Sequence, residues 1–322
     1  MISAGRSLDL SSVSIVVLSY NRFDVIRRNL ADLATAVQNT NCELIVVDNA
    51  STDGSAQVIA EFANAHPDVK CIANNTNLGV AGGRNIGWLQ ASREFILSID
   101  DDTLLSLEAA HGLLEFIKKK PKIGIVSPQI RHASTLGAQF YFDDIEYKPA
   151  GFHEACHMVR RSIIDTVGLY DESCSFGGEG LDLSVRTRAG GYEVAYFGDV
   201  TVLHENLIRS GAEGRYRRER WVYGFVRLHH KYFPWSVATR FSLRYLVSHL
   251  VSGMRAFGPL LAMRLLKAAL RGYRDGRQAR QQIPDAIVRF YSDPELRPEF
   301  GNAPIWRKLL QRMRRQSAAH GA

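Results

Sequence analysis

Short apolar runs alternate with longer amphipathic stretches over the first 130 positions of the chain. Apolar runs that end in polar loops predict strands over 13–18, 43–48, 69–73, 95–100 and 123–127. Apolar residues at helical spacing predict helices over 23–37, 55–65 and 107–119, and a further helix that begins near Arg84. This alternation indicates a mostly parallel α/β sheet with right-handed crossovers and helices on its faces.

The alternation loosens after position 128. Patterns there predict a strand over 154–159, helices over 161–167 and 181–189, and strands over 192–197 and 200–204. The rest of the chain is expected to be helical, with breaks at Pro234 and Pro259. We therefore divide the chain into an α/β domain at 1–204, with halves at about 11–128 and 129–204, and a helical extension at 205–322.

The charge of the chain changes sign at the same boundary. The 322 residues carry 40 basic and 33 acidic side chains, a net charge of +7. Residues 1–204 hold 17 basic and 25 acidic side chains, whereas residues 205–322 hold 23 and 8. An arginine-rich tail predicts an anionic partner. Apolar residues beside the arginines favour an anionic membrane surface, with a solvated helix face as the alternative. Nucleic acid is not expected, because no nucleic-acid-binding motif accompanies the charge.

Cysteine usage and hydropathy bear on the compartment. The four cysteines lack Cys-x-x-Cys spacing, which indicates buried thiols in a reducing environment. Cys156 lies between two histidines, but alternating burial of a strand explains this segment better than zinc does. No signal peptide or membrane-spanning run is expected. We expect a cytoplasmic protein, peripheral at the inner face of the plasma membrane, and the apolar tail offers a face for a homodimer.

Three carboxylates follow the apolar run 95–99. A buried strand there would place Asp100, Asp101 and Asp102 outside the carboxyl end of the sheet, where α/β proteins bind ligands. Crowded carboxylates repel one another unless a cation or a proton neutralises them. A divalent cation that carries phosphate oxygens is the simplest occupant. The alternative is that these aspartates and Thr103 cap the next helix.

Polar loops follow the other strands in a distinctive order. They read Ser19-Tyr-Asn-Arg22, Asp48-Asn-Ala-Ser-Thr-Asp-Gly-Ser55, Asn74-Asn-Thr-Asn-Leu-Gly-Val-Ala-Gly-Gly83, Phe176-Gly-Gly-Glu-Gly-Leu-Asp-Leu183 and Val200-Thr-Val-Leu-His204. The glycine-rich loop fits neither the dinucleotide fingerprint nor the P-loop, so a dinucleotide site is not expected. Together with the aspartates, the order resembles the family 2 glycosyltransferases, inverting enzymes of the GT-A fold, including bacterial rhamnosyl- and galactosyl-type transferases. The resemblance covers about residues 11–233.

The resemblance implies a nucleotide-diphospho-sugar donor, carried by UDP or dTDP, and transfer to an acceptor hydroxyl on a glycan, a lipid-linked sugar or a small molecule. It assigns donor binding to Ser19, Tyr20, Asn21, Arg22, Asp48, Asn49, Asn77, Gly79, Arg84, Asn85, Asp100 and Asp101. It makes Asp102 the principal ligand of Mg²⁺ or Mn²⁺, with Asp100 and His204 as further ligands. For His204 the alternative is a strand-end histidine bonded to backbone. Arg84 and Asn85 are also predicted to lie at a helix start, where anions bind.

The chain departs from the family at the expected catalytic base. Many members read Glu-Asp-x-Asp, with the second residue as the base, whereas this chain reads Glu179-Gly-Leu-Asp182. Either Glu179 or Asp182 could take the proton of the acceptor, and Glu179 is preferred because it precedes the helix in a glycine-rich turn. The alternative is that both carboxylates only favour the helix N-terminus. Two other functions compete, a sugar nucleotidyltransferase and a non-catalytic nucleotide-sugar-binding protein of the same fold.

Overall fold

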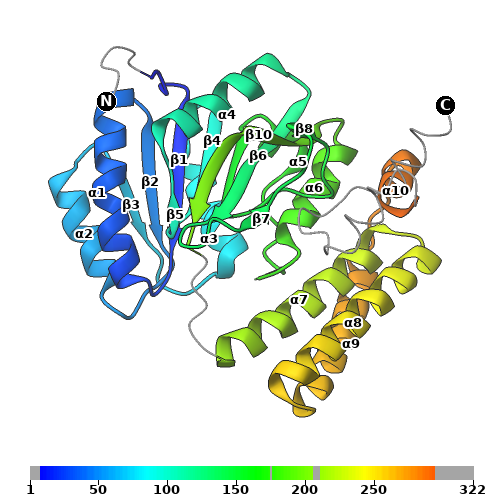
Figure 1. Cartoon of the computed structure of the whole chain (residues 1–322). Coiled ribbons are helices and arrows are strands. Elements are labelled where there is room, and N and C mark those ends of the chain that lie inside the picture. Colours follow the sequence, from blue (N-terminus) through cyan, green and yellow to red (C-terminus); the bar gives the residue numbers. More distant parts are fainter. Residues whose placement is uncertain (1–7, 175, 206–210, 294–322) are drawn as a thin grey trace.

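A computed structural model describes residues 8–174, 176–205 and 211–293. An α/β body is followed by a layer of long helices (Figure 1). The strands of the body are β1 Val13–Ser19, β2 Glu43–Asp48, β3 Lys70–Ala73, β4 Phe95–Asp100, β5 Thr103–Leu104, β6 Ile123–His132, β7 Ala138–Phe140, β8 Glu146–Tyr147, β9 Cys156–Arg160 and β10 Glu193–His204. Its helices are α1 Phe23–Thr40, α2 Ser55–Ala65, α3 Gly79–Gln90, α4 Leu107–Lys119, α5 Ile163–Val167 and α6 Glu179–Ala189.

All the described strands belong to one mixed sheet. Its main order is β3-β2-β1-β4-β9-β6-β10-β5, with β7 paired to β6 and β8 to β10. The strands β3, β2, β1 and β4 are mutually parallel, as are β6 and β10, but β9 lies antiparallel between β4 and β6. The sheet is therefore mostly parallel where the donor half was predicted, and β9 joins the two halves.

The sheet is buried on both faces, which explains the continuous apolar runs of its central strands. Alternate residues of β1 face opposite sides, since Ile15 and Val17 pack with α1 and α4, whereas Val16 packs with Trp88 of α3. Helices α3, α5 and α6 cover the second face. The polar loops at the strand ends are thus held by a rigid two-sided core.

Three long helices form a layer beside the body, α7 Gly211–Tyr232, α8 Trp235–Phe257 and α9 Leu260–Gln278, followed by the short α10 Asp285–Ser292 (Figure 1). The predicted breaks at Pro234 and Pro259 are confirmed, because these prolines precede α8 and α9. Glycines let the backbones approach closely. A Cβ at Gly276 of α9 would lie 2.4 Å from the Arg227 carbonyl oxygen of α7. The layer is therefore tightly packed upon itself.

Two sequence predictions are wrong in detail. The third helix begins at Gly79 rather than near Arg84, so the glycine-rich loop forms its first turn. The two strands predicted at 192–197 and 200–204 are one strand, β10, whose pairing with β6 shifts between Phe197 and Thr201. A local irregularity in pairing had the same sequence pattern as a turn. Within the described parts of the chain, no helix has the length and apolarity that crossing a membrane would require.

Candidate functional site

The carboxylate cluster lies where the carboxyl ends of the central strands meet. Asp100 ends β4, and Asp101 and Asp102 form the turn that leads into β5. Strand β5 pairs antiparallel with the end of β10, with Thr103 opposite His204. This short pairing, which the sequence did not predict, brings His204 beside the aspartates from a hundred residues away in the chain.

Asp100, Asp102 and His204 form a group that could hold a metal ion. One potential ligand atom from each lies within 4.8 Å of the others, and in the described residues no other histidine, cysteine or carboxylate group of three converges so closely. His204 Nε2 lies 3.0 Å from Asp102 Oδ1, and its Nδ1 lies 2.7 Å from Gln139 Oε1. Donation from Nδ1 to the amide oxygen directs Nε2 toward the carboxylates, which is the tautomer a metal ligand needs. The donor set therefore fits a divalent cation, and the mixed nitrogen and oxygen ligands suit Mn²⁺.

The alternative that the aspartates cap the next helix does not hold. Ser106 occupies the N-cap of α4, and its Oγ accepts a hydrogen bond of 3.1 Å from the backbone N–H of Ala109. Asp102 instead binds Arg22 Nη1 at 3.0 Å through Oδ2. The cysteine-containing segment likewise forms no metal cluster in the described residues, since Cys156 is a buried free thiol in β9 and His157 Nε2 lies 2.8 Å from the Tyr170 hydroxyl.

The electrostatics of the cluster reflect the burial and the mutual repulsion of its carboxylates. Burial and, next, the charge of the neighbouring Asp102 raise the pKa of Asp101 to about 7, although Arg22 and a hydrogen bond of 2.7 Å from Ser19 Oγ oppose the shift. Burial lowers the pKa of His204, but the hydrogen bond and the charge of Asp102 outweigh burial and raise it overall. Asp100 and Asp102 thus each have an arginine partner, whereas Asp101 is the carboxylate whose charged form burial disfavours.

The loops after β1 and β2 form a polar wall beside the cluster. Asp48 is buried, its Oδ2 accepts from the Ser51 N–H at 3.1 Å, and its Oδ1 has no hydrogen-bond partner among the described residues. Tyr20 is exposed, and the Asn21 side chain accepts from the Thr52 N–H at 2.7 Å, which joins the two loops. The two loops thus present an exposed aromatic ring at Tyr20 and a carboxylate oxygen of Asp48 that has an open hydrogen-bonding position.

Asn49 positions the loop that holds Asn77 and Gly79, two of the residues predicted to bind the donor. Its amide nitrogen donates to Asn77 Oδ1 at 3.1 Å and to the Gly79 carbonyl at 3.0 Å. Its amide oxygen accepts from the Leu78 N–H at 3.1 Å. Asn49 is itself buried, and its three hydrogen bonds fix the position of the start of α3.

Arg84 and Asn85 do not lie at a helix start, and that prediction is wrong because α3 begins five residues earlier. Arg84 is 1% exposed, and its guanidinium group binds Asp100 Oδ1 at 2.6 Å. It therefore contacts the carboxylate cluster from the interior of the protein. Asn85 exchanges two hydrogen bonds with the backbone of Tyr170, at 2.9 and 3.0 Å. Arg84 therefore connects α3 to the carboxylate cluster, whereas Asn85 connects α3 to the segment around Tyr170.

The two carboxylates predicted as base candidates have different surroundings. Asp182 is fully buried, and its oxygens accept from Lys231, Tyr232 and Arg186 at 2.7–2.8 Å. Glu179 is 1% exposed, and its Oε2 has no partner among the described residues. Burial raises the pKa of Glu179 well above its ordinary value, and the nearby carboxyl of Glu154 raises it further.

Sequence reasoning missed Glu154, which precedes β9. Its Oε1 accepts from the Gly180 N–H at 2.6 Å, and its backbone oxygen accepts from Arg84 at 3.1 Å. Glu154 lies 26 residues before Gly180, in a segment with no motif of its own. The one sequence feature that pointed to a carboxylate from elsewhere was the absence of a side chain at Gly180.

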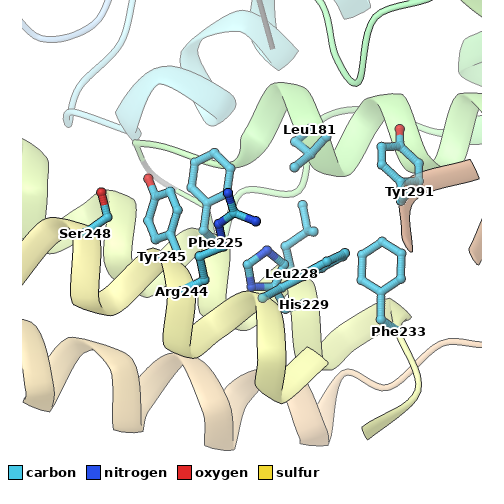
Figure 2. A pocket seen from close by; sticks show the side chains of 10 residues that line it. Leu181, Phe225, Leu228, His229, Phe233, Arg244, Tyr245, Ser248 and Tyr291 are labelled. Atoms are coloured by element: carbon cyan, nitrogen blue, oxygen red, sulfur yellow. The ribbon is translucent and has the colours of Figure 1, made fainter. Parts of the chain in front are cut away.

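A separate apolar cavity of about 300 Å³ lies between α6, α7, α8 and α10 (Figure 2). Leu181, Phe225, Leu228 and Phe233 contribute to its wall, and Arg244 is the one residue in its lining with a permanent charge. No carboxylate lines it. It is therefore distinct in chemistry from the carboxylate cluster.

Family models match most of this architecture. The model of glycosyl transferase family group 2 matches residues 95–274, and that of glycosyl transferase family 2 matches residues 14–168. The chain belongs to the family 2 glycosyltransferases. The matched regions include the carboxylates of the β4 end and the start of α6, so the family assignment covers both parts of the candidate site.

Relatives and solved structures agree with this assignment. A poly-β-1,6-N-acetyl-D-glucosamine synthase of Staphylococcus epidermidis is 30% identical over 129 residues, which are 39% of this chain and 31% of that protein. The chain thus spans about a third of that relative. The mannosyltransferase PcManGT of Pyrobaculum calidifontis, solved with GDP-Man and Mn²⁺, has a TM-score of 0.54 at 19% identity, covering 86% of this chain and 84% of its own. TarS 1-349 of S. aureus with UDP has a TM-score of 0.51 at 15% identity, covering 83% and 90%. These structures establish the GT-A fold that the sequence predicts.

Proposed function

We propose that this glycosyltransferase moves a sugar from a UDP- or dTDP-sugar to an acceptor hydroxyl, with inversion and with Mg²⁺ or Mn²⁺. The observation that carries the proposal is the convergence of Asp100, Asp102 and His204 at the carboxyl ends of the strands. The neighbouring wall of Tyr20, Asn21 and Asp48 offers a place for the nucleoside. The GDP-Man and Mn²⁺ bound to PcManGT and the UDP bound to TarS support this choice of ligands.

The residues have separable tasks in this reaction. Asp102 and Asp100 would hold the cation together with His204. Arg22 orients Asp102, and Arg84 orients Asp100. A divalent cation bound there would stabilise the negative charge that develops on the leaving diphosphate. The acceptor hydroxyl is a weak nucleophile, so a carboxylate must take its proton. When that carboxylate lies across the anomeric carbon from the diphosphate, attack inverts the configuration.

The helical layer supports a membrane-bound acceptor. Exposed apolar side chains recur every three or four residues on its outer helices, at Leu243, Val247, Val251 and Met254 on α8 and at Leu260, Met263, Leu266 and Leu270 on α9. On α9 the exposed Arg264, Lys267 and Arg271 lie beside this stripe. Such a face suits the surface of an anionic bilayer, with the apolar residues in the acyl boundary. We place the enzyme at the inner face of the plasma membrane, acting on a lipid-linked or growing glycan.

Two measurements test the proposal. Nucleoside diphosphate release and sugar transfer are followed with UDP-glucose, UDP-N-acetylglucosamine, dTDP-rhamnose and GDP-mannose, with Mn²⁺ or with a chelator. Metal-dependent release from one donor supports the proposal. Pyrophosphate release from a nucleoside triphosphate would indicate the nucleotidyltransferase instead, and binding of a nucleotide sugar without turnover would indicate the non-catalytic binding protein. Co-sedimentation with phosphatidylglycerol vesicles, compared with phosphatidylcholine vesicles, tests the membrane face, and a concentration-dependent dimer without vesicles would assign that face to self-association.

A further inference from the structure

The space that a side chain at Gly180 would need is already filled. A Cβ built on Gly180 would lie 2.4 Å from Glu154 Oε1, 2.9 Å from its Cδ and 3.0 Å from its Cγ. Real Cβ atoms essentially never approach another atom so closely. The whole carboxyl end of Glu154 therefore stands where the side chain of residue 180 would begin. Position 180 is the one at which the resemblance to the family places the base, and Gly180 has no carboxylate to offer.

The backbone around Glu154 fixes this carboxylate at the edge of the site. Strand β9 pairs antiparallel with β4, with Ile99 opposite Cys156, and the pairing continues through a hydrogen bond of 3.0 Å from the Asp100 N–H to the Ala155 carbonyl. Glu154 is the next residue outward. One nitrogen of Arg84 also donates both to Asp100 Oδ1, at 2.6 Å, and to the Glu154 carbonyl, at 3.1 Å. Glu154 is thus tied to the metal-binding end of β4 without being a ligand itself.

The Glu154 carboxylate is oriented as well as placed. Its Oε1 accepts the hydrogen bond from the Gly180 N–H in the first turn of α6, which leaves Oε2 to accept a proton from a substrate. The positive end of the α6 helix dipole favours a carboxylate at this point. A side chain at residue 180 would have to displace this arrangement, so Gly180 and Glu154 are complementary.

Exposure distinguishes Glu154 from Glu179. Glu179 is 1% exposed, whereas Glu154 is only partly buried as a residue. Burial raises the pKa of both carboxyls, and the repulsion between them favours a state in which one is protonated. Arg84 opposes the effect of burial on Glu154 more directly than on Glu179, for which Glu154 is the larger influence.

We propose that Glu154 is the catalytic base of this enzyme and replaces the carboxylate that is absent at Gly180. The proposal rests on the proposed transfer reaction. In the step, the acceptor O–H bond breaks and its proton passes to Glu154 Oε2. The acceptor oxygen forms a bond to the anomeric carbon, and the bond from that carbon to the diphosphate oxygen breaks, with its electron pair leaving on the diphosphate.

The test moves the carboxylate from one residue to the other. Hydrolysis is measured with the fastest donor of the nucleotide-sugar panel, with water or glycerol as the acceptor, and affinity for the nucleoside diphosphate with Mn²⁺ is measured by calorimetry. Glu154→Gln and Glu154→Ala are expected to lower turnover at least about 100-fold, the usual effect of removing a general base, with affinity changed less than about twofold. Glu179→Gln is expected to keep at least about a tenth of the turnover.

The double variant Glu154→Ala with Gly180→Asp is the decisive protein. Removal of the Glu154 side chain opens the space for the new one, so turnover is expected to rise at least about tenfold above Glu154→Ala. The matched control, Glu154→Ala with Gly180→Asn, has the same shape without a base and is expected to show no rise. Full turnover in Glu154→Gln would overturn the proposal, and so would equal turnover in the two double variants. A wild-type protein that binds the donor but does not hydrolyse it would also overturn the proposal. If the wild-type protein binds no nucleotide, the proposed function itself is wrong.

Discussion

Substitution of Gly224 by alanine tests how the helical layer is attached to the catalytic body. Gly224 lies in the middle of α7, and a Cβ there would lie 1.9 Å from the Gly177 carbonyl oxygen and 3.0 Å from the Gly177 carbonyl carbon. Gly177 and Gly178 have positive φ values of 89° and 93°, and they form the turn just before Glu179. The obstacle is backbone on both sides, so no side-chain rotation relieves it.

The magnitude follows from opposing effects. Contacts of a Cβ below 3.0 Å are essentially never found, so α7 or the turn must move by at least about 1.1 Å. Overpacking of this kind costs about 1–3 kcal/mol. The same movement strains the contacts of Lys231 and Tyr232 with Asp182, both 2.8 Å long. Against this, alanine favours a helix interior by about 1 kcal/mol over glycine. These two effects leave about 0–2 kcal/mol, and weakening of the contacts with Asp182, by about 1 kcal/mol, brings the expected net loss in the free energy of unfolding to about 1–3 kcal/mol.

The assay is urea unfolding followed by circular dichroism, with turnover measured on the folded variant. Gly211→Ala is the matched control on the same helix, because among the described residues its Cβ would meet no atom closer than 3.9 Å. It is expected to be at least as stable as the wild type. Gly224→Ala should also lose turnover by more than it loses nucleotide affinity, because the displaced turn carries Glu179 and the Gly180 N–H. Equal stability of Gly224→Ala and Gly211→Ala would refute the close packing of α7 against this turn.

Two further predictions concern charged groups away from the proposed metal ligands. Lys231→Met removes the ammonium group that bridges Asp171 at 2.7 Å and Asp182 at 2.8 Å, and is expected to lower the free energy of unfolding by about 3 kcal/mol, since each carboxylate keeps one other cationic partner. The control Lys267→Met, on the exposed face of α9, should change it by less than about 0.5 kcal/mol, and similar values for both would contradict a structural role for the bridge. Burial raises the pKa of Glu43, but hydrogen bonds from Lys70, Ser14 and Ser92 outweigh it and lower the pKa from 4.5 to about 2. Because the folded-state pKa is lowered, this carboxylate stabilises the protein above about pH 4.5, and the stabilisation is lost as the pH falls toward 2. Glu43→Gln should therefore cost about 1–2 kcal/mol at pH 7, reduced for solvent screening, with a difference from wild type that shrinks at pH 3; a difference independent of pH would contradict the assignment.

The fold was predictable because the local sequence pattern specifies most of its helices and strands. The strands of the donor half are continuous apolar runs, and each helix between them has a clear periodicity, as in 107–119. The start of α3 was not predictable in this way, because four glycines between 79 and 87 are poor helix formers and Gly79 was taken as loop. Tertiary packing decides instead, since Gly83 and Gly87 let α3 lie against Leu18 and Val16 of β1.

The site was predictable where one residue type repeats at a strand end, and not where the tertiary structure brings distant residues together. Asp100, Asp101 and Asp102 are visible as a run, and their place after an apolar strand indicates a cation site. The contact between Glu154 and Gly180 depends on the antiparallel insertion of β9, which no local pattern specifies. The preference for Glu179 as the base rested on sequence position alone and stays a prediction that the carboxylate-transfer experiment tests against Glu154.

We propose that the cluster of Asp100, Asp102 and His204 binds a cation together with a nucleoside diphosphate. Calorimetric titration of UDP, dTDP and GDP, with and without Mn²⁺, tests it in the wild type, in Asp102→Asn and in the exposed-site control Asp68→Asn. We predict Mn²⁺-dependent binding of one nucleoside diphosphate that weakens at least about tenfold in Asp102→Asn and is unchanged in Asp68→Asn. Absence of nucleotide binding under every condition, or equal binding by all three proteins, would contradict it.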